Sequence, residues 1–335
     1  LEEVAEELQR RWAAVNRVAR SEEVRQALAD LYAAPGARSL MDRLSDAELP
    51  EAEAEILRRQ FHDLPARQAL QVALAEAIPT YVDAPDDVAS WFLCDTRGLS
   101  TVRLPAPTTV GKNYAWRSFF HGGPIDLDPA WRPKPDERLK ETTISAVFRS
   151  QATTHWIVAV STPIFANSGS EEFLGVVALT VELGQFLELE GSASQFAVLV
   201  DWRDGPQKGL LIQHPLFNRL ISEQGILPEQ FKDYRLTPGR LPDTPARQRD
   251  YRDPLAAAPE GERLDRPWLA HMAPIRMRMA DTGWIVIVQE AHDAAIGRTL
   301  QRLRSGLIHY GIIALALVGL VMVVLWIAAT RLSRT

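Results

Sequence analysis

The chain has 335 residues and a net charge of −6, and 46% of its residues are hydrophobic and 24% charged. With a mean hydropathy of −0.12, these values are typical of globular proteins and exclude a disordered, collagen-like or disulfide-stapled chain. The acidic balance argues against a nucleic-acid-binding protein, in which a basic excess is usual. At this length two domains are expected rather than one.

The N-terminal part of the chain is predicted to be helical. Residues 1–31 carry apolar side chains at spacings of mostly three and four, which predicts one long amphipathic helix. The Ala-Pro-Gly sequence at 34–36 ends this helix. The helical pattern then continues to residue 78, with interruptions at Pro50 and Pro65. We therefore expect a bundle of helices before the first strand.

An antiparallel sheet is predicted next, because short apolar segments alternate with turns too short for a helical crossover. Asp95–Gly98 forms one tight turn, and residues 105–140 are rich in Pro and Gly around the aromatic stretch Tyr114–Phe120. Strands are expected over 88–94, 99–104, 142–148, 155–165 and 173–182.

A second passage of the same kind follows, with a long proline-rich loop over about 235–267. Its strands are expected over 196–201, 209–213, 268–277 and 283–290. A Trp, an apolar stretch, a Pro-Ile pair and a Gly-led apolar strand occur in order in both passages, at Trp156, Pro163-Ile164 and Gly175, then at Trp268, Pro274-Ile275 and Gly283. The chain therefore contains two copies of one antiparallel α+β unit.

A membrane-spanning helix is predicted near the C-terminus. Residues 311–329 contain no charged side chain, and at ~1.5 Å per residue they would cover about 28 Å, close to the hydrocarbon thickness of a bilayer. Arginines flank both ends, so their number does not decide the orientation. Because the chain begins with Leu1 rather than Met, we expect residues to precede it, and the single Cys94 allows no internal disulfide.

The ordered set of motifs resembles the double Cache family of extracytoplasmic sensor domains. The resemblance rests on Tyr114–Phe120, on the segments Trp156–Ile164 and Gly175–Thr180, and on Leu199–Asp201 with Gly209–Pro215. It covers nearly the whole chain before residue 305. The residues of the two strand segments are most similar to those in Cache regions of bacterial, especially planctomycete, serine/threonine kinases. It implies a long N-terminal helix, two PAS-like antiparallel-sheet modules and a C-terminal helix that enters the membrane.

These considerations predict the following organisation: an N-terminal helical region with a stalk helix (1–80), a membrane-distal PAS-like module (81–190), a membrane-proximal PAS-like module (191–290), a juxtamembrane helix (291–306) and a transmembrane helix (307–330).

The resemblance also implies a ligand site in the distal module. Arg117 matches the arginine that precedes two aromatic positions in the family, here Phe119 and Phe120. The amino-acid-binding subset adds a Tyr and an Asp, where this chain has Lys112 and Thr180. The missing Asp disfavours an amino acid, whereas Arg117 favours a carboxylate or another anion because a guanidinium binds it with paired hydrogen bonds.

Each candidate also has a structural interpretation. Arg117 could instead pair with an Asp or stack on Trp116, and Phe119, Phe120 and Tyr114 could be core residues. Trp131 could cap the pocket or pack on the surface. Ser145 and Thr180 lie on strands that could face the ligand. The full set of ligand-binding candidates is Arg117, Tyr114, Phe119, Phe120, Trp131, Ser145 and Thr180.

No known catalytic motif is present, and His155, His214 and His271 have no second histidine or carboxylate at metal-ligand spacing. His155, His214 and His271 are interpreted as structural, and neither metal nor cofactor is expected. We predict a non-enzymatic, extracytoplasmic sensor at the inner membrane that binds a small anion, forms a homodimer and signals to a cytoplasmic domain outside this chain.

Two alternatives stay open. The first is a membrane-anchored envelope enzyme with an unfamiliar site among His121, His155 and Asp126, which would show strongly perturbed pKa values there. The second is a membrane-tethered scaffold for proteins, which would show a large exposed apolar patch and no cavity in the distal module.

Overall fold

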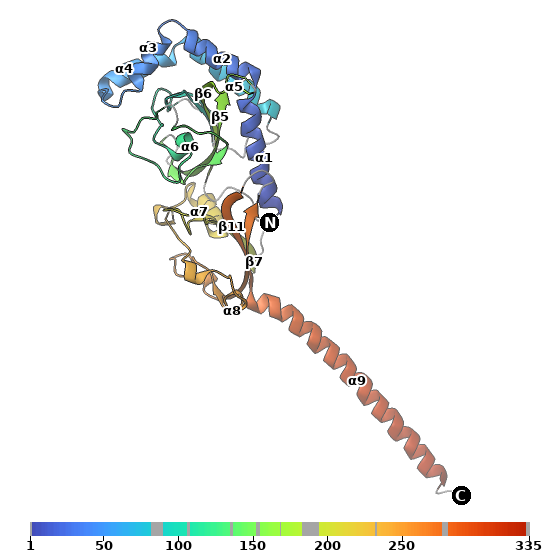
Figure 1. Cartoon of the computed structure of the whole chain (residues 1–335). Helices are drawn as coiled ribbons and strands as arrows, with labels where there is room; N and C mark the ends of the chain where they lie inside the picture. Colours follow the sequence, from blue (N-terminus) through green and yellow to red (C-terminus); the bar gives the residue numbers. More distant parts are fainter. Residues whose placement is uncertain are drawn as a thin grey trace.

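Two sheet modules follow one another along the molecule, with a helical layer beside the first and a long helix leaving the second (Figure 1). The computed structural model describes residues 2–81, 90–105, 108–134, 137–151, 155–167, 169–182, 194–231, 233–276 and 281–332. The two sheets are antiparallel throughout, so the predicted α+β class is confirmed.

Five helices lie between residues 2 and 81, where the sequence predicted one long helix followed by a helical stretch with two interruptions. The expected single helix over 1–31 is wrong, because the chain breaks at Ser21, whose hydroxyl accepts a hydrogen bond from the Val24 N–H and begins a new helix. The expected interruptions at Pro50 and Pro65 are confirmed. The helices are α1 (Glu2–Ala19), α2 (Glu22–Ala33), α3 (Ala37–Leu44), α4 (Glu51–His62) and α5 (Pro65–Tyr81).

The distal module has a six-stranded sheet with the order β2-β1-β6-β5-β3, to which β4 adds beside β5. The strand expected over 142–148 is wrong as one element, because Ser145–Val147 leave the ladder between two short strands. Its elements are β1 (Ser90–Cys94), β2 (Ser100–Leu104), α6 (Ser118–His121), β3 (Thr143–Ile144), β4 (Phe148–Arg149), β5 (Trp156–Phe165) and β6 (Phe173–Glu182).

The two faces of the distal sheet have different coverings. One face, with Leu93 and Val160, packs against α1, α2 and α5 in the large apolar core. The opposite face, with Phe92 and Ala159, carries a separate aromatic cluster under the loop that holds α6. Since alternate residues of a strand point to opposite faces, both sets of side chains come from the same strands.

The proximal module repeats the distal one. Its sheet order is β8-β7-β11-β10-β9. When the short strands β3 and β4 of the distal sheet are counted as one, both sheets place their strands in the same order, as the predicted repeat requires. Three elements were not predicted from the sequence: the helix Pro215–Gln224 and, inside the expected loop, the helix Pro245–Arg249 and the edge strand Tyr251–Arg252. The elements are β7 (Gln195–Asp201), β8 (Leu211–Gln213), α7 (Pro215–Gln224), α8 (Pro245–Arg249), β9 (Tyr251–Arg252), β10 (Pro267–Arg276) and β11 (Asp281–Ala291).

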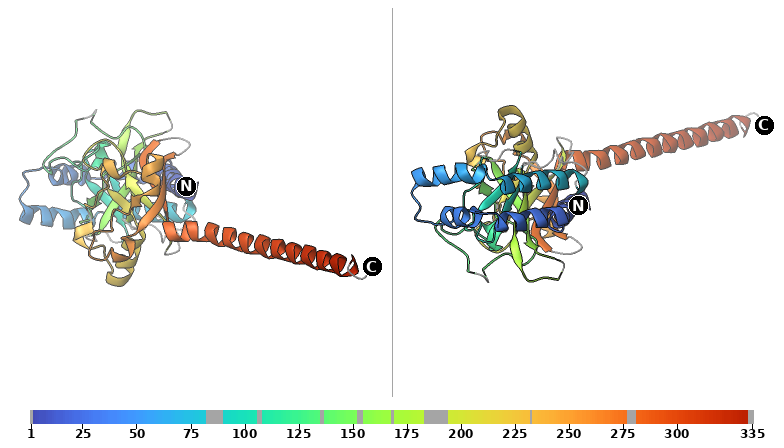
Figure 2. Two further views of the ribbon diagram at one scale, coloured as in Figure 1. Left: turned by 90° about the horizontal axis from the view of Figure 1, so that it is seen from below. Right: turned by 90° about the horizontal axis from the view of Figure 1, so that it is seen from above.

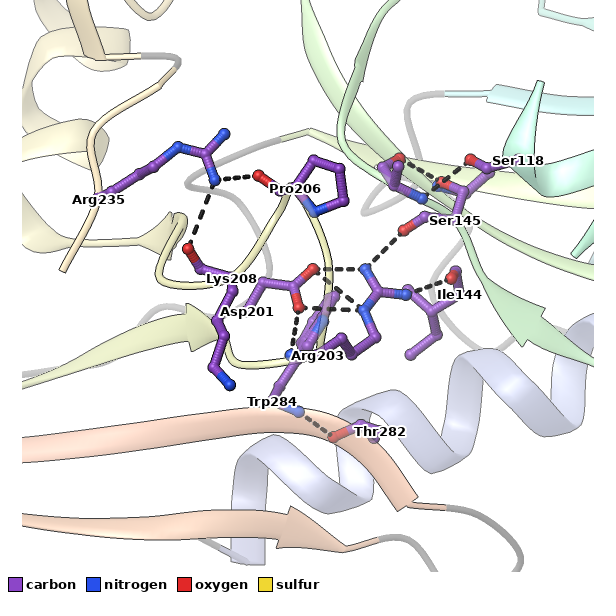
Figure 3. A network of polar contacts seen from close by, with 12 residues as sticks. Ser118, Ile144, Ser145, Asp201, Arg203, Pro206, Lys208, Arg235, Thr282 and Trp284 are labelled. Carbon is purple, nitrogen blue, oxygen red and sulfur yellow. Dashed lines mark hydrogen bonds and ion pairs between the residues drawn. The ribbon is translucent and has the colours of Figure 1, made fainter. Parts of the chain in front are cut away.

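One arginine joins the two modules. Arg203 follows β7 and donates hydrogen bonds to the backbone carbonyls of Ile144 (2.6 Å) and Ser145 (2.9 Å) in the distal module (Figure 3). Its guanidinium is also paired with the fully buried Asp201 at 2.5 Å. Helix α1 adds a second connection because it packs against β5 and β6 and also reaches β10.

Helix α9 (His292–Leu332) begins at the end of β11 and extends away from both modules (Figure 2). It continues without a break through the region that was expected to divide into a juxtamembrane and a transmembrane helix. Among the residues that the structure describes, no helix combines the length and the apolar character that crossing a membrane requires. The predicted span is therefore not confirmed.

Candidate ligand-binding site

A small cavity lies on the face of the distal sheet that the helices leave uncovered. Its volume is about 30 Å³, which is room for a single water molecule. A larger ligand would therefore extend out of the open side of the cavity or displace part of the wall. Strands supply the floor, and the α6 loop and the β4 region supply the rest. The lining residues are Phe92, Ser100, Arg103, Thr109, Tyr114, Arg117, Phe119, Phe148, Ser150, Gln151 and Ile157.

Arg117 lines the cavity, but most of its guanidinium is already engaged. It donates to Asp126 at 2.5 Å and to the Arg149 carbonyl at 3.3 Å. The guanidinium carbon also lies 4.0 Å from the centre of the Trp116 ring and 4.8 Å from that of Phe148, which are cation–π contacts. Its Nε–H is buried and has no partner. The ion pair and the stacking expected as the structural interpretation are therefore present, and the contact of Arg117 with a ligand, for which the buried Nε–H is available, stays a prediction.

Tyr114 and Phe119 form the aromatic wall. The Tyr114 hydroxyl donates to Gln151 Oε1 at 3.0 Å, and burial raises the pKa of Tyr114 to about 12. The hydroxyl is therefore neutral at pH 7, and its single proton is donated to Gln151. Phe119 packs edge-on against Phe92, with ring centres 4.8 Å apart, and lies 5.6 Å from Phe148.

Four predicted ligand contacts are not in the cavity lining. Phe120 packs beside Phe173 in the same aromatic cluster, and Trp131 lines a separate groove next to His121. The Ser145 hydroxyl accepts from the Ala159 N–H at 2.9 Å, within the sheet. The Thr180 hydroxyl lies 2.8 Å from that of Ser90. Their roles as ligand contacts stay predictions.

Ser145 instead lies between the cavity and the proximal module. Its carbonyl accepts from Arg203, while the neighbouring Ala146 N–H donates to the Ser118 hydroxyl (Figure 3). The Ser118 N–H in turn donates to Asp126, the partner of Arg117. A continuous set of hydrogen bonds therefore links the cavity arginine to the second module.

Sequence reasoning missed Ser100 and Arg103, which lie on β2. The visible clue was a charged residue inside an apolar strand, Thr101-Val102-Arg103-Leu104. The alternation of residues alone could not show which face of the sheet Arg103 occupies, because a one-residue irregularity in a strand moves the following side chains to the opposite face.

The histidines have structural partners. His155 Nδ1 lies 2.7 Å from Glu182, His214 Nε2 lies 3.1 Å from the buried Asp253, and His121 Nδ1 accepts from the Gly123 N–H. Burial lowers the pKa of His121. Within the described ranges, no three His, Cys, Asp or Glu side chains are placed to hold a metal ion.

No family model and no curated protein sequence matches this chain. Among solved structures, the ligand-binding domain of the Pseudomonas fluorescens chemoreceptor CtaA in complex with L-leucine is similar, at 15% identity, a TM-score of 0.43, and coverage of 88% of this chain and 97% of that chain. The sensor domain of the Vibrio cholerae histidine kinase DctB has 14% identity, a TM-score of 0.40 and coverage of 85% and 90%. At this distance, what the chain binds has to be inferred from its own residues.

Proposed function

We propose that this chain is the ligand-sensing region of a membrane-bound receptor, and that the distal cavity receives a small carboxylate or similar anion. The observation that carries the proposal is a partly open cavity whose walls combine aromatic rings with cationic and hydroxyl donors. Ligand sites typically have this mixture of apolar lining and a few polar groups. Two of the site residues predicted from the sequence supply polar groups to its wall: Arg117, whose Nε–H has no partner, and Tyr114.

The distal module provides a route for a signal. A ligand changes a receptor only if it binds one conformation more tightly than another. A ligand that contacts the wall of this small cavity would bear on the α6 loop, which carries Arg117 and Ser118. Those residues connect through Ser145 to Arg203, and the proximal module leads directly into α9.

The membrane anchor is part of the same proposal. It is supported by the uncharged segment 311–329 and by the exposure of its apolar side chains, for example Leu315 at 74% and Trp326 at 68%. A contiguous apolar surface of this kind is rare on soluble proteins. The modules would lie outside the cytoplasm, a homodimer would form through the N-terminal helices, and a cytoplasmic domain beyond this chain, with a serine/threonine kinase as first candidate, would receive the signal.

The test is a thermal-unfolding screen of the full chain in detergent micelles against carboxylates (acetate, succinate, L-malate), amino acids, amines and nucleobases. Saturable stabilisation by one class supports sensing, since a ligand that binds only the folded state at 100 times its Kd adds about 2.7 kcal/mol. The double variant Arg117→Met/Asp126→Asn removes both charges of the ion pair and should weaken that stabilisation. Unchanged unfolding temperatures with every class would contradict the proposal.

A further inference from the structure

Arg103 is a buried arginine without an anionic partner. It lies on β2, the edge strand of the distal sheet next to β1, and only 8% of the residue is exposed. Among the described residues its guanidinium has neither a hydrogen bond nor a carboxylate partner, and the ionisable side chain that influences it is Tyr114. Burial lowers the pKa of Arg103. Burying a cation without a partner is costly, so proteins rarely retain one without use for its charge.

A β-bulge aims this arginine at the cavity. Phe92 pairs with Arg103 and Cys94 pairs with Ser100, so Thr101 is the extra residue opposite β1. Without the bulge, positions 100 and 103 would point to opposite faces of the sheet. With it, both share the face of Phe92, and both line the cavity. Bulges commonly redirect side chains in this way next to binding sites.

Ser100 supplies a second unsatisfied group. Its hydroxyl is buried and has no hydrogen-bond partner, although its backbone N–H and carbonyl are bonded to Lys112 and Gly111. A buried hydroxyl normally has a partner. A guanidinium and a hydroxyl that lack partners in one cavity together form a set of donors suited to the two oxygens of a carboxylate.

Arg117 differs from Arg103 in charge balance. Its positive charge is compensated by Asp126 at 2.5 Å, so a ligand anion bound to Arg117 alone would share a cation that is already neutralised. Arg103 has no such carboxylate among the described residues, and an anion beside it would complete the pair. The net positive charge of the cavity therefore comes from strand β2 rather than from the α6 loop.

We propose that Arg103, assisted by the Ser100 hydroxyl, is the charge anchor of the distal site and binds a carboxylate of the ligand. Arg117, whose charge is compensated by Asp126, shapes the cavity and offers its Nε–H. This inference rests on the proposed sensing function and names the residue that determines its preference for anions. The ligand class is a small carboxylate, of which the neutral amide analogue is not bound.

The experiment compares matched probes on the full chain in detergent micelles: acetate with acetamide, and succinate with succinamide, at constant ionic strength. Thermal unfolding is measured for the wild type, Arg103→Met, Arg103→Lys and Ser100→Ala. Arg97→Met is the matched control, because Arg97 belongs to the same hairpin but is exposed, paired with Asp42 and outside the cavity.

We expect carboxylates but not amides to stabilise the wild type and Arg97→Met. Arg103→Met should bind the carboxylate at least tenfold more weakly, and Arg103→Lys and Ser100→Ala should weaken binding to a smaller degree. Without ligand, Arg103→Met should unfold no earlier than the wild type, since it removes an unpaired buried charge; this measurement shows that loss of binding is not loss of folding.

Two results would overturn the anchor. Carboxylate stabilisation that survives in Arg103→Met would place the charge recognition elsewhere, and the absence of any carboxylate effect would exclude this ligand class. If amines or nucleobases stabilise the wild type and Arg103→Met equally, the sensing function stands and the Arg103 assignment fails. If no class of compound changes the unfolding temperature, both fail.

Discussion

The first strand of each module ends in the same Asp-x-Arg turn, but the two arginines contact different partners. Asp95 accepts from the Arg97 N–H at 2.8 Å and Asp201 accepts from the Arg203 N–H at 3.0 Å, so each aspartate stabilises its own turn. The Arg97 side chain then turns outward to Asp42 of the helical layer. The Arg203 side chain folds back on Asp201 and reaches the distal module.

This difference shows how a repeated module acquires separate roles. The turn is a local structure, and both copies retain it because the backbone hydrogen bond is made within a few residues. The direction of the arginine depends on the neighbouring layer, which is a helix beside the distal module and a second sheet beside the proximal one. In the proximal module the arginine neutralises the buried aspartate, whereas in the distal module it does not.

The largest expected effect distinguishes the cores of the two modules. Trp268 is fully buried and its indole N–H donates to the Leu264 carbonyl, while Trp156 at the equivalent place in the distal module is half-buried. We expect Trp268→Ala to lower the free energy of unfolding by about 3–5 kcal/mol and Trp156→Ala to cost clearly less. Urea unfolding followed by circular dichroism measures both; equal losses would contradict the difference in burial.

Removing the connection between the modules should be nearly as costly. Arg203→Met leaves the fully buried Asp201 without its cation, and breaking a buried pair on one side costs about 3–5 kcal/mol. The double variant Asp201→Asn/Arg203→Met removes both charges and should recover a large part of that loss in the same urea experiment. If the double variant is as unstable as Arg203→Met, the stability comes from the hydrogen bonds of Arg203 to the carbonyls of Ile144 and Ser145 and not from its ion pair with Asp201.

Asp95 should make the distal module sensitive to pH. Burial raises the pKa of Asp95 to about 6, so the folded state binds the proton more tightly than the unfolded state, in which the pKa is about 3.9. The corresponding stability is complete below about pH 4 and is lost as the pH rises through 6. Relative to Asp95→Asn, the wild type should lose about 2 kcal/mol between pH 4 and pH 7.5.

The measurement is the free energy of unfolding of both proteins at several pH values, since groups common to both cancel in the difference. Asn keeps an oxygen that can accept from the Arg97 and Leu99 N–H groups that Asp95 binds. A difference that does not vary with pH would mean that Asp95 has an ordinary pKa in the folded protein.

The smallest effect is expected for the outward arginine of the distal turn. The side chains of Arg97 and Asp42 are 42% and 50% exposed, and exposed ion pairs contribute about 0–1 kcal/mol. Arg97→Met should therefore shift the urea midpoint only slightly and should do so less at high salt. A loss similar to that of Arg203→Met would remove the contrast between the two turns.

Much of the architecture could be predicted from local patterns. The alternation and apolar composition of residues 173–182 gave the strand with its observed bounds, and the proline breaks separated α3, α4 and α5. The helix break at Ser21 was missed because the apolar spacing continues across it while the hydroxyl caps a new helix. The two-residue strand β9 was missed because so short an edge strand has no periodicity to detect.

The candidate site was predictable only in part. Tyr114, Arg117 and Phe119 line the cavity, as the motif around them suggested. Ser145 stays a predicted ligand contact, but its position between two short strands, with its carbonyl bonded to Arg203 of the other module, could not be predicted.

The sequence by itself determined the two repeated α+β modules, the turns that close their hairpins and the uncharged C-terminal segment, because these follow from composition and from periods of a few residues. Only the tertiary structure decided which arginine of the cavity has a carboxylate partner among the described residues and which has none. One extra residue, Thr101, turns Arg103 and Ser100 toward the same cavity, and Asp126 neutralises Arg117 from nine positions along the chain. Charge pairing depends on positions in space, and a strand pattern does not fix those when a single bulge reverses its faces.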